Sequence, residues 1–444
     1  MTRSILVGLA GFLAGAAVLL AGLLPSTLRT GQVVPADWLM PGALAIAALA
    51  LLARRDGRAP SWPALAAIWM LATLPVMLLI LTMASRVPWR GLALLAAGFL
   101  LVALAIGLAV RRSPAILWPS LAVVLALTGA ARWIAAERDG ARPAGGRAPA
   151  VAIMSALPLQ GAALGDRADP LPDLGARSPL WRALERRLAL HPLDALDAPD
   201  LAGVDRLLLA QPRLLAPAEL VALDDWVRAG GQVVILADPL LHWPDGRPLG
   251  DPRRPPLTSL LDPLLAHWGL RLEPAQYDVD ADPVERRLLD DGTLLQLAGA
   301  SRFTRVGSGV GSDGARCDLA EAGLVAQCRI GRGRARLIAD ADWLHDALWT
   351  HDPGHLAAPA GWTSDAIAAL AMWLSGNAWD GDSGRIWLID QNRLISGLRA
   401  AFGLLVILAG MGAWMGRAGA HDARDGAAIK GRIVNKTGLY PDSA

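Results

Sequence analysis

The sequence predicts an α-helical membrane region of about six spans joined to one three-layer α/β domain. Apolar residues make up 54% of the 444 residues and charged residues only 18%. The mean hydropathy is +0.38, which is too apolar for an ordinary soluble enzyme. Between the apolar runs lies a long segment, rich in Pro and Asp, in which strand and helix patterns alternate. That alternation is typical of an α/β domain.

Six apolar runs approach the ~20 residues that a helix needs to cross ~30 Å of hydrocarbon. Five precede the polar segment and one follows it: Ser4–Leu24, Ala36–Ala53, Pro63–Met83, Gly91–Val110, Pro114–Ala131 and Leu394–Gly416. We therefore expect five membrane helices in residues 1–136 and a linker in 137–148. The α/β domain should follow in 149–392, a sixth membrane helix in 393–416 and a C-terminal tail in 417–444.

The placement of basic residues predicts the orientation of these spans. If every run crosses the bilayer, most short-loop and terminal basic residues fall on one side: Arg3, Arg54, Arg55, Arg58, Arg111, Arg112, Arg417, Arg424, Lys430, Arg432 and Lys436. Positive residues mark the cytoplasmic side. The expected protein is thus a multi-pass protein of a bacterial inner membrane, with both termini cytoplasmic and the large domain periplasmic.

The composition also narrows the partners. Membrane lipid is one, whereas no basic stripe interleaved with aromatics suggests nucleic acid. No span holds a mid-membrane Asp, Glu or Lys of the kind that secondary transporters use. In the first span Gly8, Ala10, Gly11 and Gly15 have a spacing that favours close helix contact. Ala and Gly are common throughout the chain, however, so the spacing alone does not require a specific helix partner.

The first half of the polar segment alternates strands and helices. We expect strands at Val151–Leu159, Arg206–Ala210 and Val233–Ala237, and helices at Arg177–Leu190 and Pro217–Ala229. Ser178 should cap the first helix, with Pro179 at its first position, and a Gly-Gly pair closes the second. Short connections between such elements imply right-handed crossovers and a parallel sheet covered on both faces.

The second half is more irregular. We expect a helix near Leu257–Trp268, an inserted hairpin within Arg271–Leu297, and a hairpin of Cys317–Ala320 with Leu324–Ile330. The stretch GRGRARLIADADWL, Gly331–Leu344, reads as a turn and a strand that approaches one sheet edge in the antiparallel sense. A helix at Ser364–Leu374 should close the domain.

Two stretches carry a resemblance to a known family. DRLLLAQPRLLAPAELVALDDWVRAGGQVVILADP, followed much later by RIGRGRARLIADADWL and a helix, resembles the extracytoplasmic domain of gliding-motility-type auxiliary proteins of ABC transport systems. The resemblance covers about Val151–Leu374, although that family usually has one N-terminal span. It implies a flavodoxin/glutamine-amidotransferase-like fold, and it implies an ABC ATPase and a permease in other chains as partners.

Catalysis by a nucleophile is not expected. The chain has no G-x-S-x-G or G-x-C-x-G elbow and no Walker A pattern, and neither cysteine follows a parallel strand. We predict no cofactor and no catalytic residue. Counting outward from an Ala322-Gly323 turn sets Cys317 opposite Cys328, within disulfide reach. That register makes them a hydrogen-bonded pair, a less favourable geometry, so two free buried thiols remain the alternative.

Polar residues at strand ends are the other candidates: Asp238, Asp340, Asp342 and His345, with Asp346, His351, Asp352 and His355 nearby. A D-x-D pair next to histidines suits a divalent ion, but no spaced signature supports one, and the prediction is no metal site. Asp340 or Asp342 should instead cap the following helix, and Asp238 should form a turn with the next Pro.

The expected function is a non-catalytic, membrane-embedded auxiliary or permease-associated subunit of an ABC-type transport or envelope assembly. The alternative is a membrane-anchored hydrolase or ligand or metal sensor that uses the Asp340–His355 cluster.

Overall fold

The structure is a computed structural model with two compact units. It describes residues 2–53, 60–112, 148–159, 177–248, 250–251, 253–275, 283–306, 314–354, 361–375 and 385–436, with residues 122, 126 and 129. The membrane unit combines the N-terminal part of the chain with the residues from Ile386 onward. The α/β unit lies between them and ends at Arg385.

Among the residues that the structure describes, five helices of the membrane unit are long and apolar enough to cross a bilayer. They are α1 (Thr2–Leu23), α3 (Leu39–Leu52), α4 (Trp62–Met83), α5 (Trp89–Arg112) and α12 (Gln391–Lys436). For α3, the candidate span also includes the short η1 (Pro35–Trp38) before it. Four of the five predicted N-terminal spans are therefore confirmed as apolar helices, and so is the C-terminal one. The predicted span Pro114–Ala131 lies outside the described residues except for residues 122, 126 and 129. Helix α12 continues past the predicted end at Gly416 to Lys436.

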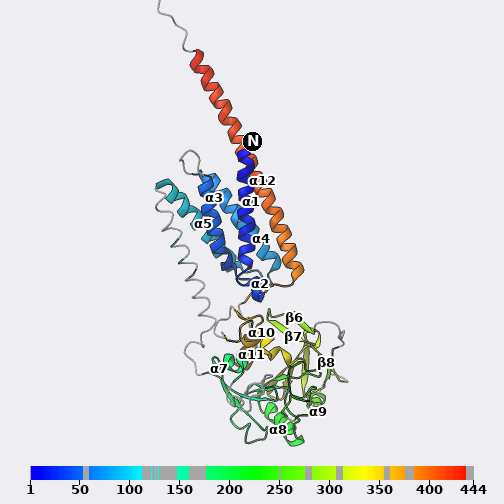
Figure 1. The fold of residues 1–444 in the computed structure, drawn as a ribbon. Coiled ribbons are helices and arrows are strands. Elements are labelled where there is room, and N and C mark those ends of the chain that lie inside the picture. Colours follow the sequence, from blue (N-terminus) through cyan, green and yellow to red (C-terminus); the bar gives the residue numbers. More distant parts are fainter. Residues whose placement is uncertain are drawn as a thin grey trace, which may run out of the picture. The chain divides into compact units, whose positions relative to one another are not determined.

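The helices of the membrane unit lie side by side as a bundle (Figure 1). Helix α12 packs against both α4 and α1. A Cβ atom added to Gly8 would lie 3.2 Å from the carbonyl oxygen of Ala409 and 3.2 Å from Cβ of Ala413, and Gly15 faces the side chain of Leu405. The small residues of α1 thus have a helix partner, because they let α12 approach closely.

One end of the bundle is tied together by backbone hydrogen bonds. Val33 N–H donates to Ile386 O at 2.8 Å, Ser85 N–H donates to Trp387 O at 2.7 Å, and Ile389 N–H donates to Met83 O at 3.0 Å. These bonds gather the α1–α3 connection, the end of α4 and the segment before α12 at the same end. We call this the connection end.

The core of the α/β unit is a seven-stranded sheet in the order β2-β1-β3-β4-β11-β10-β9. Its strands are β1 (Ala150–Ser155), β2 (Ala189–Pro192), β3 (Arg206–Ala210), β4 (Gln232–Leu236), β9 (Arg316–Ala320), β10 (Val325–Ile330) and β11 (Gly333–Ile338). The first five in this order pair in parallel, and β10 and β9 add an antiparallel edge. The expected mixed α/β architecture is confirmed.

Three helices accompany the sheet: α7 (Pro179–Glu185), α8 (Pro217–Arg228) and α11 (Ala366–Ser375). Ser178 caps α7 as predicted, because its Oγ accepts a hydrogen bond from Trp181 N–H at 3.1 Å. Helix α7 connects β1 to β2, whereas α8 connects β3 to β4 in the opposite direction along the sheet. Right-handed crossovers in opposite directions place these helices on opposite faces. Helix α11 packs against α7, β3 and β4.

A long insertion separates β4 from β11. It contains α9 (Asp262–His267), β5 (Leu270–Glu273), β6 (Val284–Leu288), β7 (Leu294–Ala298) and β8 (Arg302–Arg305), followed by the β9–β10 hairpin. Strands β6 and β7 form the hairpin predicted within Arg271–Leu297, and β5 pairs with β8 in a second small antiparallel sheet.

Three expectations about the sheet were wrong. The helix predicted over Arg177–Leu190 ends at Glu185, and Ala189–Pro192 forms the edge strand β2. Leu184 and Leu188 prolong the helical spacing of apolar residues, and a short edge strand with a proline gives little strand signal. The first strand ends at Ser155 and does not reach Leu159. Strand β11 is antiparallel to β10 but parallel to β4, so it lies inside the sheet.

Gly333, the first residue of β11, follows a glycine-rich turn and should be sensitive to substitution. A Cβ atom on Gly333 would collide with the backbone carbonyls of Val227 and Gly231 at the turn from α8 to β4. Gly333→Ala should therefore destabilise the protein by about 1–3 kcal/mol, a fall in Tm of roughly 3–10 °C. Thermal unfolding of the full-length protein in detergent, followed by tryptophan fluorescence, measures this. Gly246→Ala, where a Cβ atom would meet nothing within 4 Å, is the control, and equal Tm values for the two variants would contradict the argument.

Candidate functional site

Buried polar side chains follow three neighbouring parallel strands of the central sheet. Gln211 follows β3, Asp238 lies two residues beyond β4, and Asp340 lies two residues beyond β11. All three side chains have an exposed fraction of 0%. Because these strands are adjacent and parallel, their carboxyl ends meet at one edge of the sheet, where open α/β sheets usually bind ligands.

Asp342 joins Asp238 and Asp340 in a cluster of three carboxyl groups, which we call the carboxylate cluster. One oxygen from each residue lies within 4.8 Å of the other two. Asp342 is 2% exposed. Asp238 comes from β4 and the other two from the end of β11, so the parallel pairing of these strands creates the cluster.

Backbone N–H groups hold the carboxylate cluster. Asp238 accepts hydrogen bonds from Leu240 at 2.8 Å and from Ala341 at 3.1 Å. Asp340 accepts from Trp343 at 3.1 Å and from Ala298 at 2.9 Å. Oδ2 of Asp342 accepts from His242 at 2.7 Å. These contacts tie the start of the insertion and the β6–β7 hairpin to the end of β11.

The same contacts describe the turn-forming roles expected of the aspartates. Asp340 accepts the bond from Trp343 just before the short helix η5 (Asp342–Leu344), whose N-cap residue is Ala341. The bond from Leu240 closes a turn after Asp238. Asp342 instead reaches across to the backbone of the insertion. The three residues thus organise local turns and also converge on one another.

Gln211 also lies at this edge of the sheet, and its side chain forms hydrogen bonds with two neighbouring segments. Its Nε2 donates to the carbonyls of Asp238 at 2.9 Å and Pro256 at 3.0 Å, and its Oε1 accepts from Asp238 N–H at 2.9 Å. Its backbone φ of 42° is in the left-handed region, which is uncommon for a residue other than glycine. The hydrogen bonds of its buried side chain offset that cost and fix the path of the chain after β4.

The surroundings favour the neutral form of these carboxyl groups. Burial raises the pKa of Asp342 to about 8 and raises the pKa of Asp238. Burial also raises the pKa of Asp340 well above its ordinary value, and the neighbouring charges of Asp238 and Asp342 add to the effect. Like charges in a low-dielectric site repel, so burial opposes ionisation of all three carboxyl groups unless a cation is present.

Histidines lie at the outer side of the carboxylate cluster. Nδ1 of His242 is 3.7 Å from Oδ2 of Asp342, and the His242 side chain is 24% exposed. His345 packs edge-on against Trp243 with ring centroids 5.0 Å apart, and burial lowers its pKa. The His242 side chain is therefore partly exposed and lies beside Asp342.

The remaining members of the sequence-predicted cluster lie apart. Asp346 begins α10 (Asp346–Trp349), and His351 and Asp352 follow in an exposed-to-intermediate turn. His355 lies outside the described residues. Sequence reasoning missed Gln211 and His242. Gln211 had a usable signal, because it is a polar residue directly after an apolar strand, as Asp238 and Asp340 are.

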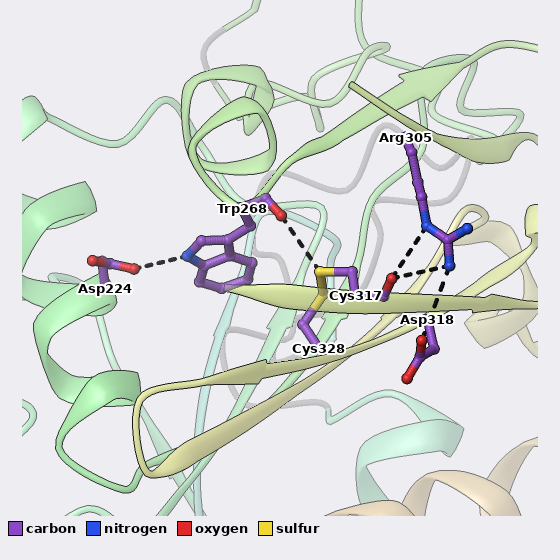
Figure 2. The surroundings of a disulfide bond; sticks show 6 residues. All are labelled: Asp224, Trp268, Arg305, Cys317, Asp318 and Cys328. Atoms are coloured by element: carbon purple, nitrogen blue, oxygen red, sulfur yellow. Dashed lines mark hydrogen bonds and ion pairs between the residues drawn. A yellow bond between two sulfur atoms is a disulfide. The ribbon is translucent and has the colours of Figure 1, made fainter. Parts of the chain in front are cut away.

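The two cysteines lie elsewhere in the α/β unit. Cys317 on β9 pairs directly with Cys328 on β10 in the predicted register, and the two form a disulfide with Cα atoms 4.0 Å apart. Figure 2 shows the bond beside Trp268, whose carbonyl oxygen lies 3.5 Å from Sγ of Cys317. Trp268 is itself held by a 2.7 Å hydrogen bond from its Nε1 to Asp224. The disulfide is buried and thus fastens the antiparallel edge of the sheet.

Comparison with known families gives a match to a transport family. A family model described as an ABC-type uncharacterized transport system matches residues 149–284, which is less than a third of the chain. The match supports an auxiliary protein of an ABC transport system, and the apolar helices are consistent with a membrane location.

Solved structures give only remote matches. An exo-β-1,4-mannosidase from an Opitutaceae bacterium is 14% identical with a TM-score of 0.29; the match covers 58% of this chain and 39% of that chain. A cytoplasmic protein from Salmonella typhimurium is 10% identical with a TM-score of 0.25, covering 43% and 87%. A β-galactosidase from Bacillus circulans is 10% identical with a TM-score of 0.24, covering 44% and 29%. Such low scores carry no argument about fold or activity. No curated protein matches the chain.

Asp346 gives a prediction for pH dependence. Burial raises the pKa of Asp346 to about 6, from an ordinary value of about 3.9. Its folded-state pKa exceeds its unfolded-state pKa, so its contribution to stability is present below pH 4 and is lost as the pH rises through 6. Asp346→Asn replaces the carboxyl group by an amide that does not ionise, so the variant does not lose this stability as the pH rises. The variant should therefore gain about 1–2 kcal/mol relative to wild type between pH 4 and pH 7, a modest figure because the carboxyl group is partly exposed and screened.

Denaturant unfolding of both proteins at pH 4, 5, 6 and 7 measures the difference. The exposed Asp205 provides the control substitution, Asp205→Asn. A constant difference between Asp346→Asn and wild type over this range would show that Asp346 does not titrate as argued.

Proposed function

We propose that the chain is a non-catalytic auxiliary or permease-associated subunit of an ABC-type transport or envelope assembly. In this role the membrane unit docks among lipids and partner subunits, and the α/β domain binds or scaffolds another component. The observation that carries the proposal is the match of an ABC transport family model to residues 149–284, within the α/β unit. ATP hydrolysis would come from another chain, because this sequence contains no Walker A pattern.

The sheet topology supports a finer assignment of the fold. The five parallel strands run in the order β2-β1-β3-β4-β11. In chain order this is 2-1-3-4-5, the order of flavodoxin-like doubly wound sheets. That order favours the glutamine-amidotransferase-like domain suggested by the resemblance, with the insertion and the antiparallel edge added between the fourth and fifth parallel strands.

Two features favour scaffolding over catalysis. The residues at the strand ends, Gln211, Asp238 and Asp340, are fully buried, so the crevice that usually receives a substrate is filled by the protein's own side chains at this point. Both cysteines are joined in a buried disulfide, which leaves neither as a nucleophile. A binding surface would then lie on the outside of the domain.

The membrane orientation is part of the proposal. Residue Ile386, where the chain returns from the α/β unit, is bonded to Val33 at the connection end. The α1–α3 and α4–α5 connections therefore lie on the side from which the chain enters α12. Positive residues predict the opposite side as cytoplasmic, which puts the α/β domain in the periplasm. The disulfide is consistent with an oxidising compartment.

Thiol trapping in intact cells tests this orientation. Cells are quenched with acid, and denatured protein is alkylated with a heavy maleimide before or after reduction. Wild-type protein should show no shift without reductant and a shift of two labels after reduction. Cys317→Ser, which leaves one thiol, should show one label in both conditions. Two labels on wild-type protein without reductant would place the domain in a reducing compartment and overturn the orientation.

Purification with partners tests the transport role. The tagged full-length protein is isolated in mild detergent and the accompanying proteins are identified by mass spectrometry, with an unrelated multi-pass protein carrying the same tag as control. We expect an ATP-binding subunit and a permease to be recovered in stoichiometric amounts with this chain and not with the control protein. Recovery of this chain without them, repeated after crosslinking in membranes, would count against the proposal.

A further inference from the structure

When they are ionised, the three carboxyl groups of the carboxylate cluster concentrate negative charge in a buried site. Three carboxyl groups converge within 4.8 Å, and the basic side chain placed against them is His242, 3.7 Å from Asp342. That distance exceeds an ordinary hydrogen bond. Burying carboxylates without a cation costs several kcal/mol each, so an anionic cluster of this kind requires a positive partner.

We propose that Asp238, Asp340 and Asp342 form a binding site for one hard divalent cation of the Ca²⁺ type, with one carboxylate oxygen from each residue as ligand. This inference does not depend on the proposed transport role. No metal signature appears in the sequence because Asp238 and Ala341, the residue between the other two ligands, are 103 positions apart. Only the parallel pairing of β4 with β11 brings them together.

The hydrogen bonds provide an observation separate from the clustering of charge. Five of the six carboxylate oxygens accept a backbone N–H. The sixth, Oδ1 of Asp342, is buried and receives no backbone hydrogen bond from the described residues. The Asp342 side chain is 2% exposed and lies within hydrogen-bonding reach of the Asp238 side chain. A buried acceptor without a donor costs about 1–3 kcal/mol. A cation in the cluster would satisfy this oxygen.

The chemistry of the ligands limits the class of cation. The three carboxylate oxygens lie within 4.8 Å of one another, which is close enough for one Ca²⁺ ion bound at about 2.4 Å. An all-oxygen ligand set suits Ca²⁺, Mg²⁺ or Mn²⁺ better than Zn²⁺ or Cu²⁺. Backbone N–H donors favour the ionised carboxylates that such an ion needs.

Direct binding of Ca²⁺ and Tb³⁺ tests the proposal. Full-length protein in detergent is stripped with EDTA, desalted and titrated with Tb³⁺, with emission excited through tryptophan. Trp343, whose backbone N–H binds Asp340, lies next to the site as a sensitiser. We expect one saturable Tb³⁺ site that Ca²⁺ displaces. Calorimetry with Ca²⁺ alone should give the same stoichiometry, and Ca²⁺ should raise Tm.

Two variants assign the site. Asp342→Asn replaces one anionic ligand by a neutral amide and should weaken Ca²⁺ binding by about 100-fold, since loss of a residue that only supports a ligand already costs 10–100-fold. Asp346→Asn changes a partly buried carboxyl group four residues away and should bind as wild type does. Retention of the Cys317–Cys328 disulfide and of the near-ultraviolet circular dichroism spectrum shows that each variant is folded.

The outcomes separate this inference from the proposed function. Absence of a one-to-one site in wild-type protein overturns it, whatever the variants do. Equal affinities of wild type and Asp342→Asn would show that the ion binds elsewhere, and this also overturns it. Neither result bears on whether an ATP-binding subunit and a permease purify with the chain. Failure of the purification, conversely, leaves the Ca²⁺ titration unaffected.

Discussion

The parallel pairing of β4 with β11 is the constraint on which the α/β unit depends. Residues Gln232–Leu236 pair in register with Arg334–Ile338, although an insertion of almost a hundred residues separates the two strands. Closing so long a segment costs loop entropy, which burial of the strands must offset; Val233, Ile235, Leu337 and Ile338 have exposed fractions of 0%. The same pairing positions the disulfide-bonded edge hairpin and brings together the carboxyl groups from the two strand ends.

The parallel pairing of β4 with β11 also has an electrostatic cost, because it brings the buried carboxyl groups of the carboxylate cluster together. A buried strand end is the place where open α/β sheets bind ligands, and here three acidic side chains and Gln211 occupy it. Their hydrogen bonds reach the start of the insertion, the β6–β7 hairpin and η5. The acidic residues therefore fasten three separate segments to the sheet. This fastening is weakest when all three are ionised without a cation, because their mutual repulsion then opposes the packing that brings them together.

Local signals in the sequence were enough for much of the fold but not for the site. The periodicity of α8, the Ser178 cap and the opposition of Cys317 to Cys328 depend on neighbours within a few residues or one hairpin, so they could be predicted. Strand β2 could not, because Leu188 continues the helical spacing of α7. Asp238 and Asp340 were each recognised as strand-end residues. Their contact depends on which strands are neighbours across the insertion, and no local pattern carries that information.

The segment matched by the family model contains only part of the carboxylate cluster. The transport role and the cation site therefore rest on different residues. The matched segment, 149–284, contains β1 to β4 with Gln211, Asp238 and His242, but it ends before β11. Asp340 and Asp342 therefore lie outside it. A transport role inferred from the match says nothing about a cation, since two of the three ligands are contributed by a strand that the match does not include. The cation site follows instead from the geometry of this chain's own β4–β11 pair, so the two inferences stand or fall on different residues.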